Sequence, residues 1–314
     1  MTDLAIFHEH PTWFAPLFAA LDRRGIAYRR IQSGAAFDPA AAAPPAPLVF
    51  NRISMSAFLR DAEHPIFWAG ALIAQWESRG ARVLNGSAAL AIDTSKARQL
   101  ALLSGLGLAI PATRVVHRAA DLLAAADSIG FPLLVKGNIG GAGAGIARYD
   151  TREELRAAIA DASVPTSIDG VRLVQEYVPA RGGTITRIET LDRRYLYAID
   201  VAGGGAFDLC PADACGAGST ITMTASEPPQ ALRDAAEAIT RAAQIDVGGI
   251  EVLIDDRCGT PRFYDINALS NFVARPLDVL GWDPHETLVD RIEGWLSEAR
   301  SAKQPDWLPS RHAA

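Results

Sequence analysis

A lysine followed by a cluster of glycines is the first feature of the sequence that could do chemistry. Lys136 ends the apolar run "FPLLVK", and Gly140, Gly141, Gly143 and Gly145 follow within ten residues. Glycines let backbone N–H groups approach a phosphate closely, and a lysine adds a point charge for the same anion. The segment matches neither the dinucleotide-binding nor the Walker A pattern, because its glycines separate two expected strands. It is either a glycine-rich flap over a nucleotide or a plain turn beside a lysine that extends to water.

Oxygen-bearing side chains on two expected strands form a second constellation. Glu251 lies in "GGIEVLIDD", and Asp265 and Asn267 lie two residues apart in "PRFYDIN", so those two share one face of a strand. Two carboxylates and an amide oxygen are hard ligands of the kind Mg²⁺ prefers. Their neighbours are apolar, and buried carboxylates need a cation or hydrogen bonds to compensate for lost hydration. The alternative is a pair of acids on a solvent-exposed sheet face.

The segment "LVQEYVP" is a third, weaker signal. Gln175 and Glu176 stand between apolar residues at the end of an expected strand. Backbone N–H and C=O groups there could face an adenine edge, with Glu176 accepting a hydrogen bond from the amino group. Glu176 could equally be an ordinary surface acid.

Bulk composition restricts the class of protein. The chain has 314 residues, a net charge of −6 and 49% hydrophobic residues, which is typical of a globular protein and argues against nucleic acid as a partner. The three cysteines, Cys210, Cys215 and Cys258, form no C-x-x-C pair, so we expect no disulfide framework. There is neither a signal peptide nor an apolar run of membrane-spanning length. We therefore expect a cytoplasmic protein that binds no membrane.

The elements that must position these residues fall into three expected lobes. Residues 1–92 alternate strands and helices, which indicates an open α/β lobe with a parallel sheet. A capped helix begins near Asp93 or Thr94 and opens a small α+β lobe over residues 93–174. Long strands follow in a second α+β lobe over residues 175–300, and residues 301–314 form a loose tail.

The order of these parts resembles the ATP-grasp ligases, and within them the RimK-like carboxylate–amine ligases. The matching segments cover nearly the whole chain: "NRIS", "LNGSAALAIDTSKARQLALLSGLGLAIPAT", "FPLLVKGNIGGAGAGI", "LVQEYV" and "GGIEVLID" with "FYDIN". Each segment alone is modest, but five in this order are specific. The resemblance implies an ATP-grasp fold of mixed α/β and α+β class, in which two α+β lobes clamp the nucleotide beside the N-terminal lobe.

The resemblance also implies roles for individual residues. Lys96, Lys136 and the flap glycines would hold the ATP phosphates, while Gln175, Glu176, Tyr177 and Val178 would form the adenine-facing hinge. The metal ligands would be Glu251, Asp265 and Asn267, which usually bind two Mg²⁺ ions that Mn²⁺ can replace. The two acid types are swapped relative to RimK-like enzymes, with the total charge unchanged.

The implied reaction is that of an acid–amino acid ligase. A carboxylate attacks the γ-phosphorus of ATP, and an amine then attacks the resulting acyl phosphate. Arg187 matches a family arginine near the transferred phosphate, and Arg275 could grip a carboxylate with both arms of its guanidinium. Either arginine could instead pair with a surface acid. The expected partners are a small-molecule carboxylate and an amine, and the family often forms homo-oligomers.

Some positions depart from the family pattern. The acid that holds the ATP ribose is missing from "GGTITR", where Thr184 or Thr186 would substitute for it. Asp208 replaces a family arginine, which argues against glutamate as the added amino acid and favours a cationic or neutral amine. For the acceptor, we expect contacts from the N-terminal lobe at His8, His10, Asn51 and Arg52.

Two other functions are compatible with the same residues. One is a regulatory module that binds ATP without turnover, against which the complete set of metal ligands argues. The other is a carboxylate kinase that passes its acyl phosphate to a nucleophile other than an amine.

Overall fold

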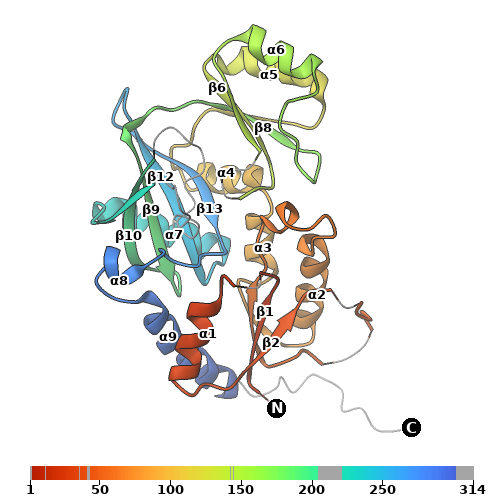
Figure 1. The fold of residues 1–314 in the computed structure, drawn as a ribbon, viewed down its shortest axis with the longest axis vertical. Coiled ribbons are helices and arrows are strands. Elements are labelled where there is room, and N and C mark those ends of the chain that lie inside the picture. The colour runs from red at the N-terminus through yellow and green to blue at the C-terminus, as the bar shows by residue number, and fades with distance from the viewer. Residues whose placement is uncertain are drawn as a thin grey trace.

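Three β-sheets, each with its own helices, build the molecule in the computed structural model (Figure 1). The structure describes residues 2–301 apart from residues 11, 35, 41–42, 142, 144 and 204–220. Asp208, Cys210, Cys215 and almost all of the predicted tail therefore lie outside the described residues. Within the described part of the chain, no helix is long and apolar enough to cross a lipid bilayer.

The N-terminal lobe is an open parallel sheet in the order β2-β1-β3-β4, which confirms the predicted topology. β1 and β3 are buried along their whole length, as expected for central strands covered on both faces. The strands are β1 (Leu4–His8), β2 (Tyr28–Gln32), β3 (Leu48–Arg52) and β4 (Arg82–Leu84), and the helices are α1 (Ala15–Arg23), the short η1 (Ala57–Leu59), α2 (Ile66–Ser78) and α3 (Ser87–Asp93).

The central lobe is a four-stranded antiparallel sheet in the order β5-β8-β6-β7. Its strands are β5 (Thr113–Val116), β6 (Leu133–Gly137), β7 (Ile146–Tyr149) and β8 (Arg172–Glu176), with η2 (Ala119–Asp121), α5 (Leu122–Ile129) and α6 (Arg152–Ala160). α6 begins with a capping box, because Thr151 accepts from the Glu154 amide and the Glu154 carboxylate reaches back to Thr151.

The helix α4 (Lys96–Gly105) begins two to three residues later than we predicted. Asp93 ends α3, and Ser95 is the cap of α4, accepting a hydrogen bond from the Arg98 amide at 3.3 Å. The later start makes Lys96 the first residue of the helix. α4 packs on β13, so Lys96 faces the sheet of the C-terminal lobe.

The C-terminal lobe is a five-stranded antiparallel sheet in the order β11-β10-β9-β12-β13. The strands are β9 (Ala180–Leu191), β10 (Arg194–Ala202), β11 (Thr222–Ser226), β12 (Val247–Asp255) and β13 (Pro261–Asn267), and the helices are α7 (Gln230–Ala243), α8 (Pro276–Val279) and α9 (Pro284–Ser301). The long strands that the sequence predicted for this lobe are β9, β10 and β12. β11 and α8 are short, and neither carries a clear apolar period.

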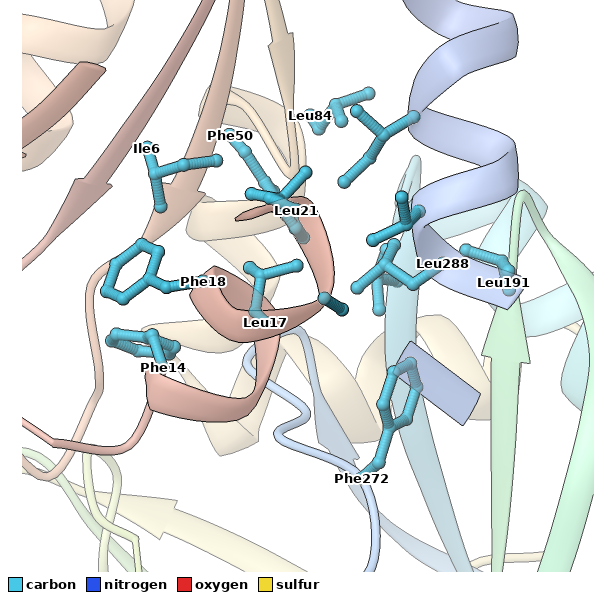
Figure 2. Close-up of a cluster of buried hydrophobic side chains, with 14 of the residues drawn as sticks. Ile6, Phe14, Leu17, Phe18, Leu21, Phe50, Leu84, Leu191, Phe272 and Leu288 are labelled. Atoms are coloured by element: carbon cyan, nitrogen blue, oxygen red, sulfur yellow. The ribbon is translucent and has the colours of Figure 1, made fainter. Parts of the chain in front are cut away.

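A continuous hydrophobic core joins the N-terminal and C-terminal lobes. Figure 2 shows Leu17 and Leu21 of α1 between Phe18 of the same helix and Leu288 of α9, all within one hydrophobic cluster. The same core contains residues from β1, β3, β9 and β10, and α1 and α9 lie side by side in Figure 1. The packing therefore holds one face of the N-terminal sheet, through α1 and α9, against the sheet that carries Glu251.

Candidate active site

A cleft lies where the three lobes meet. Its walls come from the segment after β1, the loop after β3, α3, α4, the glycine loop and the sheet of the C-terminal lobe. The lining residues are Trp13, Ser54, Met55, Ser56, Asp93, Lys96, Gln99, Gly140, Gly141, Arg187, Asp265, Ile266, Asn267, Leu269, Asn271 and Phe272.

The three predicted oxygen ligands converge on neighbouring strands. Glu251 of β12 and Asp265 of β13 stand opposite each other in the antiparallel register, and Asn267 lies one position further along the same face. The amide nitrogen Nδ2 of Asn267 lies 3.3 Å from Glu251 Oε1 and 3.4 Å from Asp265 Oδ2. The strand alternation that placed Asp265 and Asn267 on one face is therefore present.

Two cations of the chain stand against these acids. The ammonium of Lys96 forms an ion pair with Asp265 Oδ1, and Arg187 Nη1 lies 3.1 Å from Glu251 Oε1. Burial raises the pKa of Glu251, and the charge of Asp265 raises it further, while Arg187 and Lys96 oppose the rise. Burial lowers the pKa of Lys96, but the Asp265 charge and hydrogen bond outweigh it, so the net shift is upward.

Lys136 lies in the same region without an ion pair among the described contacts. It is 5% exposed, and its Nζ lies 6.0 Å from the centroid of the Tyr264 ring. Burial and the charge of Lys96 lower its pKa from 10.5 to about 8, although Asp265 and Glu251 act in the opposite direction. A buried cation without a counterion is suited to receive an anionic ligand.

The acids and the amide fit a magnesium site by their chemistry. All are hard oxygen donors, they are close together, and two cations compensate the charge of the acids where a divalent ion would otherwise do so. The described residues contain no group of three or more His, Cys, Asp or Glu side chains that could hold a metal ion, so a metal at this site would depend on the two carboxylates together with the amide of Asn267.

The glycine loop connects β6 to β7 beside these groups. Gly143 and Gly145 have φ angles of 70° and 71°, in the left-handed region that favours glycine. Gly141 lies against the N-terminal lobe, since a Cβ atom added there would sit 3.2 Å from Ser56 Cβ. Gly140 and Gly141 of this loop therefore line one side of the cleft.

The predicted adenine hinge is held by the lobes on either side of it. Glu176 Oε1 accepts from Arg257 Nη2 at 2.6 Å, and its other oxygen accepts from the Ala112 amide at 3.2 Å. Arg148 covers the Tyr177 ring, with 4.1 Å between guanidinium carbon and ring centroid. Two neighbouring side chains point inward: Gln175 donates to Thr113 Oγ1 at 2.8 Å and Val178 is buried.

The polar residues at the ends of β1 and β3 have internal partners. His8 Nδ1 donates to the His10 carbonyl at 3.1 Å, and Asn51 Nδ2 donates to the Asn85 carbonyl at 3.0 Å. Arg52 Nη2 donates to the Ser270 carbonyl and, at 2.8 Å, to Asn271 Oδ1. His8, Asn51 and Arg52 are buried beneath the cleft lining, so substrate contact by these three stays a prediction.

Three further predicted residues do not line the cleft. His10 stacks on Trp13, which lines the cleft, with 4.2 Å between ring centroids. Arg275 has a side chain 72% exposed and lies 3.8 Å from Asp278, so the structure does not bring it into the cleft. Thr184 Oγ1 donates to the Gly182 carbonyl at 3.3 Å, and its neighbour Thr186 bonds Asp200 at 2.7 Å.

Sequence reasoning missed two residues of the cleft, the partly buried Asp93 and the buried Gln99. Asp93 accepts from the Ala268 amide at 3.0 Å, and burial raises its pKa to about 7. Gln99 makes paired hydrogen bonds with the backbone of Ile266, at 2.8 Å to its oxygen and 3.1 Å from its nitrogen, and so fixes the strand between Asp265 and Asn267. An aspartate at the expected start of a helix is usually a capping residue, so its position gives no reason to place Asp93 in the site. A glutamine within a helix likewise gives no indication of a functional role.

Comparison with solved structures identifies the class of fold. D-alanine–D-alanine ligase from Bacillus anthracis complexed with ATP aligns with a TM-score of 0.68 at 16% identity, covering 97% of this chain and 100% of that one. The ATP-grasp ligase PsnB, complexed with minimal precursor, Mg and ADP, aligns with a TM-score of 0.67 at 16% identity, covering 94% and 98%. The chain therefore has the ATP-grasp fold.

The family follows from sequence. A profile of the RimK-like ATP-grasp domain matches residues 93–273, more than half of the chain, and the protein belongs to this family. A curated relative is the ribosomal protein bS6–L-glutamate ligase of Shigella flexneri serotype 5b (strain 8401), 29% identical over 203 residues. That match spans 64% of this chain and 64% of the relative, which is slightly under two thirds of its length.

Proposed function

We propose that the protein is an ATP-dependent ligase that joins a carboxylic acid to an amine through an acyl phosphate, with Mg²⁺. The observation that carries this proposal is the convergence of two acids, one amide, two lysines and Arg187 in one region, with Lys96, Arg187, Asp265 and Asn267 lining the cleft. The ATP and Mg–ADP complexes of its structural neighbours support the same ligands here. In this proposal residues 1–92 contact the acceptor, residues 93–174 carry the flap, and residues 175–300 carry the metal ligands.

Each side chain would have a separate role in phosphoryl transfer. Lys136 and Lys96 would neutralise the ATP phosphates, so that an anionic carboxylate can approach the γ-phosphorus. Lys96 must first release Asp265, which the arrival of other cations at the acids would allow. Arg187 would hold the phosphoryl oxygens as charge develops on them, and the glycine loop would exclude water that hydrolyses an acyl phosphate.

Magnesium would be held by Glu251, Asp265 and Asn267, and when bound it would neutralise phosphate charge and orient the triphosphate. The donor set is compatible with two ions and with Mn²⁺, because both ions favour carboxylate and amide oxygens. Lys96 and Arg187 form ion pairs with the same acids and so help to hold them in place.

The uncharged residues that line the cleft support a class of acid substrate. Trp13, Met55, Leu269 and Phe272 supply apolar surface, and the polar groups among them are the neutral side chains of Ser54, Ser56 and Asn271. Apolar walls with a few placed polar groups are typical of sites for small molecules. We infer that the acid is an amino acid or short peptide with an apolar side chain.

A screen of acid and amine pairs tests the proposal. ADP release that requires both an acid and an amine, with the amide product detected by mass, is the expected result. ADP release with acid alone, trapped by hydroxylamine as a hydroxamate, would favour a carboxylate kinase. Binding of Mg·ATP with no ADP from any pair would favour a regulatory module and contradict the ligase.

A further inference from the structure

The guanidinium of Arg187 lies flat against a glycine of the neighbouring strand. β9 and β12 pair so that Arg187 stands opposite Glu251, and Gly249 stands opposite Glu189. A Cβ atom added at Gly249 would lie 2.7 Å from Arg187 Nη2, 2.8 Å from Nε and 2.9 Å from Cζ. Real Cβ atoms do not approach other atoms so closely, so only glycine at position 249 leaves room for this arginine conformation.

Two carboxylates hold the same guanidinium by its edges. Arg187 Nε lies 2.6 Å from Glu189 Oε1, and Nη1 lies 3.1 Å from Glu251 Oε1. The side chain of Glu189 is 1% exposed, so its charge is almost completely removed from water. Burial of that kind is costly unless a partner is fixed in place. Glu189 lies outside the predicted metal ligands and outside the cleft lining.

We propose that Glu189 and Gly249 are positioning residues that aim Arg187 at the transferred phosphoryl group. This inference rests on the proposed function, because it takes the phosphoryl group to lie between Arg187 and the metal ligands. Gly249 admits the guanidinium to the strand surface, Glu189 sets its rotation, and Glu251 links it to the acid pair. An arginine held in this way needs no reorganisation when charge develops on the phosphoryl oxygens.

A purely structural role for the two residues makes a different prediction. If Glu189 and Gly249 only stabilise the sheet, their substitution lowers the melting temperature but leaves the turnover of folded protein unchanged. If they act through Arg187, their substitution lowers kcat, and the effect disappears once Arg187 itself is removed. A double-mutant cycle separates these cases.

The experiment compares Gly249→Ala and Glu189→Gln in the wild-type and Arg187→Ala backgrounds. Gly70→Ala in α2 is the matched control, because its nearest neighbour would be Leu90 at an ordinary 3.5 Å. In the wild-type background we expect kcat to fall by about 10- to 100-fold, with KM for ATP within about threefold. In the Arg187→Ala background we expect either substitution to change kcat by less than about threefold. Equal losses in both backgrounds, or a kcat equal to that of the control, would overturn the inference.

A readout independent of activity keeps this inference separate from the proposed function. In a crystal structure of Gly249→Ala, we expect the Arg187 guanidinium displaced from β12 and its contact with Glu189 broken. A guanidinium in its original place would overturn the positioning role even if the enzyme is a ligase. A displaced guanidinium in a protein for which no acid and amine pair releases ADP would support the positioning geometry and contradict the proposed function. If Gly249→Ala does not fold, the structure and kinetics of Glu189→Gln decide in the same way.

Discussion

We expect opposite effects on stability when Lys96 and Lys136 are each replaced by methionine. Methionine keeps most of the length of the side chain and removes the charge. In the absence of nucleotide and metal, Lys136 is a buried cation with a lowered pKa, whereas Lys96 is paired with Asp265 and has a raised pKa. We expect Lys136→Met to stabilise the ligand-free protein and Lys96→Met to destabilise it.

The size of the Lys136 effect follows from its pKa. The folded protein lowers that pKa from 10.5 to about 8. At about 1.4 kcal/mol for each pKa unit, keeping Lys136 charged at pH 7 costs the folded state about 3 kcal/mol, which methionine would recover. Removing Lys96 leaves Asp265, whose side chain is only 15% exposed, without its cation and should cost about 3 kcal/mol.

The stability effect of each lysine depends on pH in a defined direction. Because the folded-state pKa of Lys136 is lowered, the penalty is complete below about pH 8 and disappears as the pH rises toward 10.5. The gain from Lys136→Met should therefore fall to about 1.4 kcal/mol at pH 9.5. The pKa of Lys96 is raised, so its stabilisation persists up to its ordinary pKa and is lost only as the pH passes the folded-state value.

Urea unfolding of the wild type and both variants, with EDTA and then with saturating Mg·ATP, measures these quantities. Mg·ATP at 100 times its dissociation constant for the wild type should add about 2.7 kcal/mol to the free energy of unfolding of the wild type. At the same concentration it should add much less to that of Lys136→Met. A ligand-free Lys136→Met protein that is less stable than the wild type at pH 7 would refute the reasoning. Full stabilisation of that variant by Mg·ATP would refute the phosphate role of Lys136.

Four further predictions concern the site. Asp265→Asn should abolish ADP formation with an unchanged circular dichroism spectrum, and full activity would remove the metal assignment. Arg257→Met should raise the dissociation constant of ATP, measured by calorimetry, several-fold at constant kcat, because Glu176 loses a 2.6 Å ion pair. An unchanged dissociation constant would contradict the role of this hinge in binding adenine. In the wild type, the dissociation constant of ATP should also rise above about pH 8, because Lys136 loses its proton there. In Lys136→Arg it should not rise. The same pH dependence in both proteins would contradict this role of Lys136. Arg187→Ala should lower kcat by about 100-fold or more and Arg275→Ala by less than about threefold, since Arg275 is exposed; comparable losses would contradict the placement of Arg187.

Local periodicity explains why much of this arrangement could be predicted. Alternation along a strand placed Asp265 and Asn267 on one face, and the order of elements placed Glu251 on an adjacent strand. Glycines separated by one residue indicated a bent loop after Lys136, and two of them have positive φ. These features depend on residues that are close together in the sequence, so they can be predicted from the local sequence.

Long-range packing explains what could not be predicted. Nothing in the sequence near Lys96 indicates Asp265 as its partner 169 residues away, and nothing near Gly249 indicates that Arg187 covers it. Arg52 ends a parallel strand, a common place for ligand contacts, yet it turns inward to hold Ser270 and Asn271. The direction of such a side chain depends on the lobe that packs above it.

The transfer of oxygen from the acid to the released phosphate tests the central claim most directly. The enzyme would be incubated with Mg·ATP, an amine and an acid labelled with ¹⁸O in its carboxylate. Attack of that carboxylate on the γ-phosphorus predicts one ¹⁸O atom in each phosphate released, because the amine expels the oxygen together with the phosphoryl group. Unlabelled phosphate released alongside the amide product would contradict the acyl phosphate and, with it, the proposed use of this cleft.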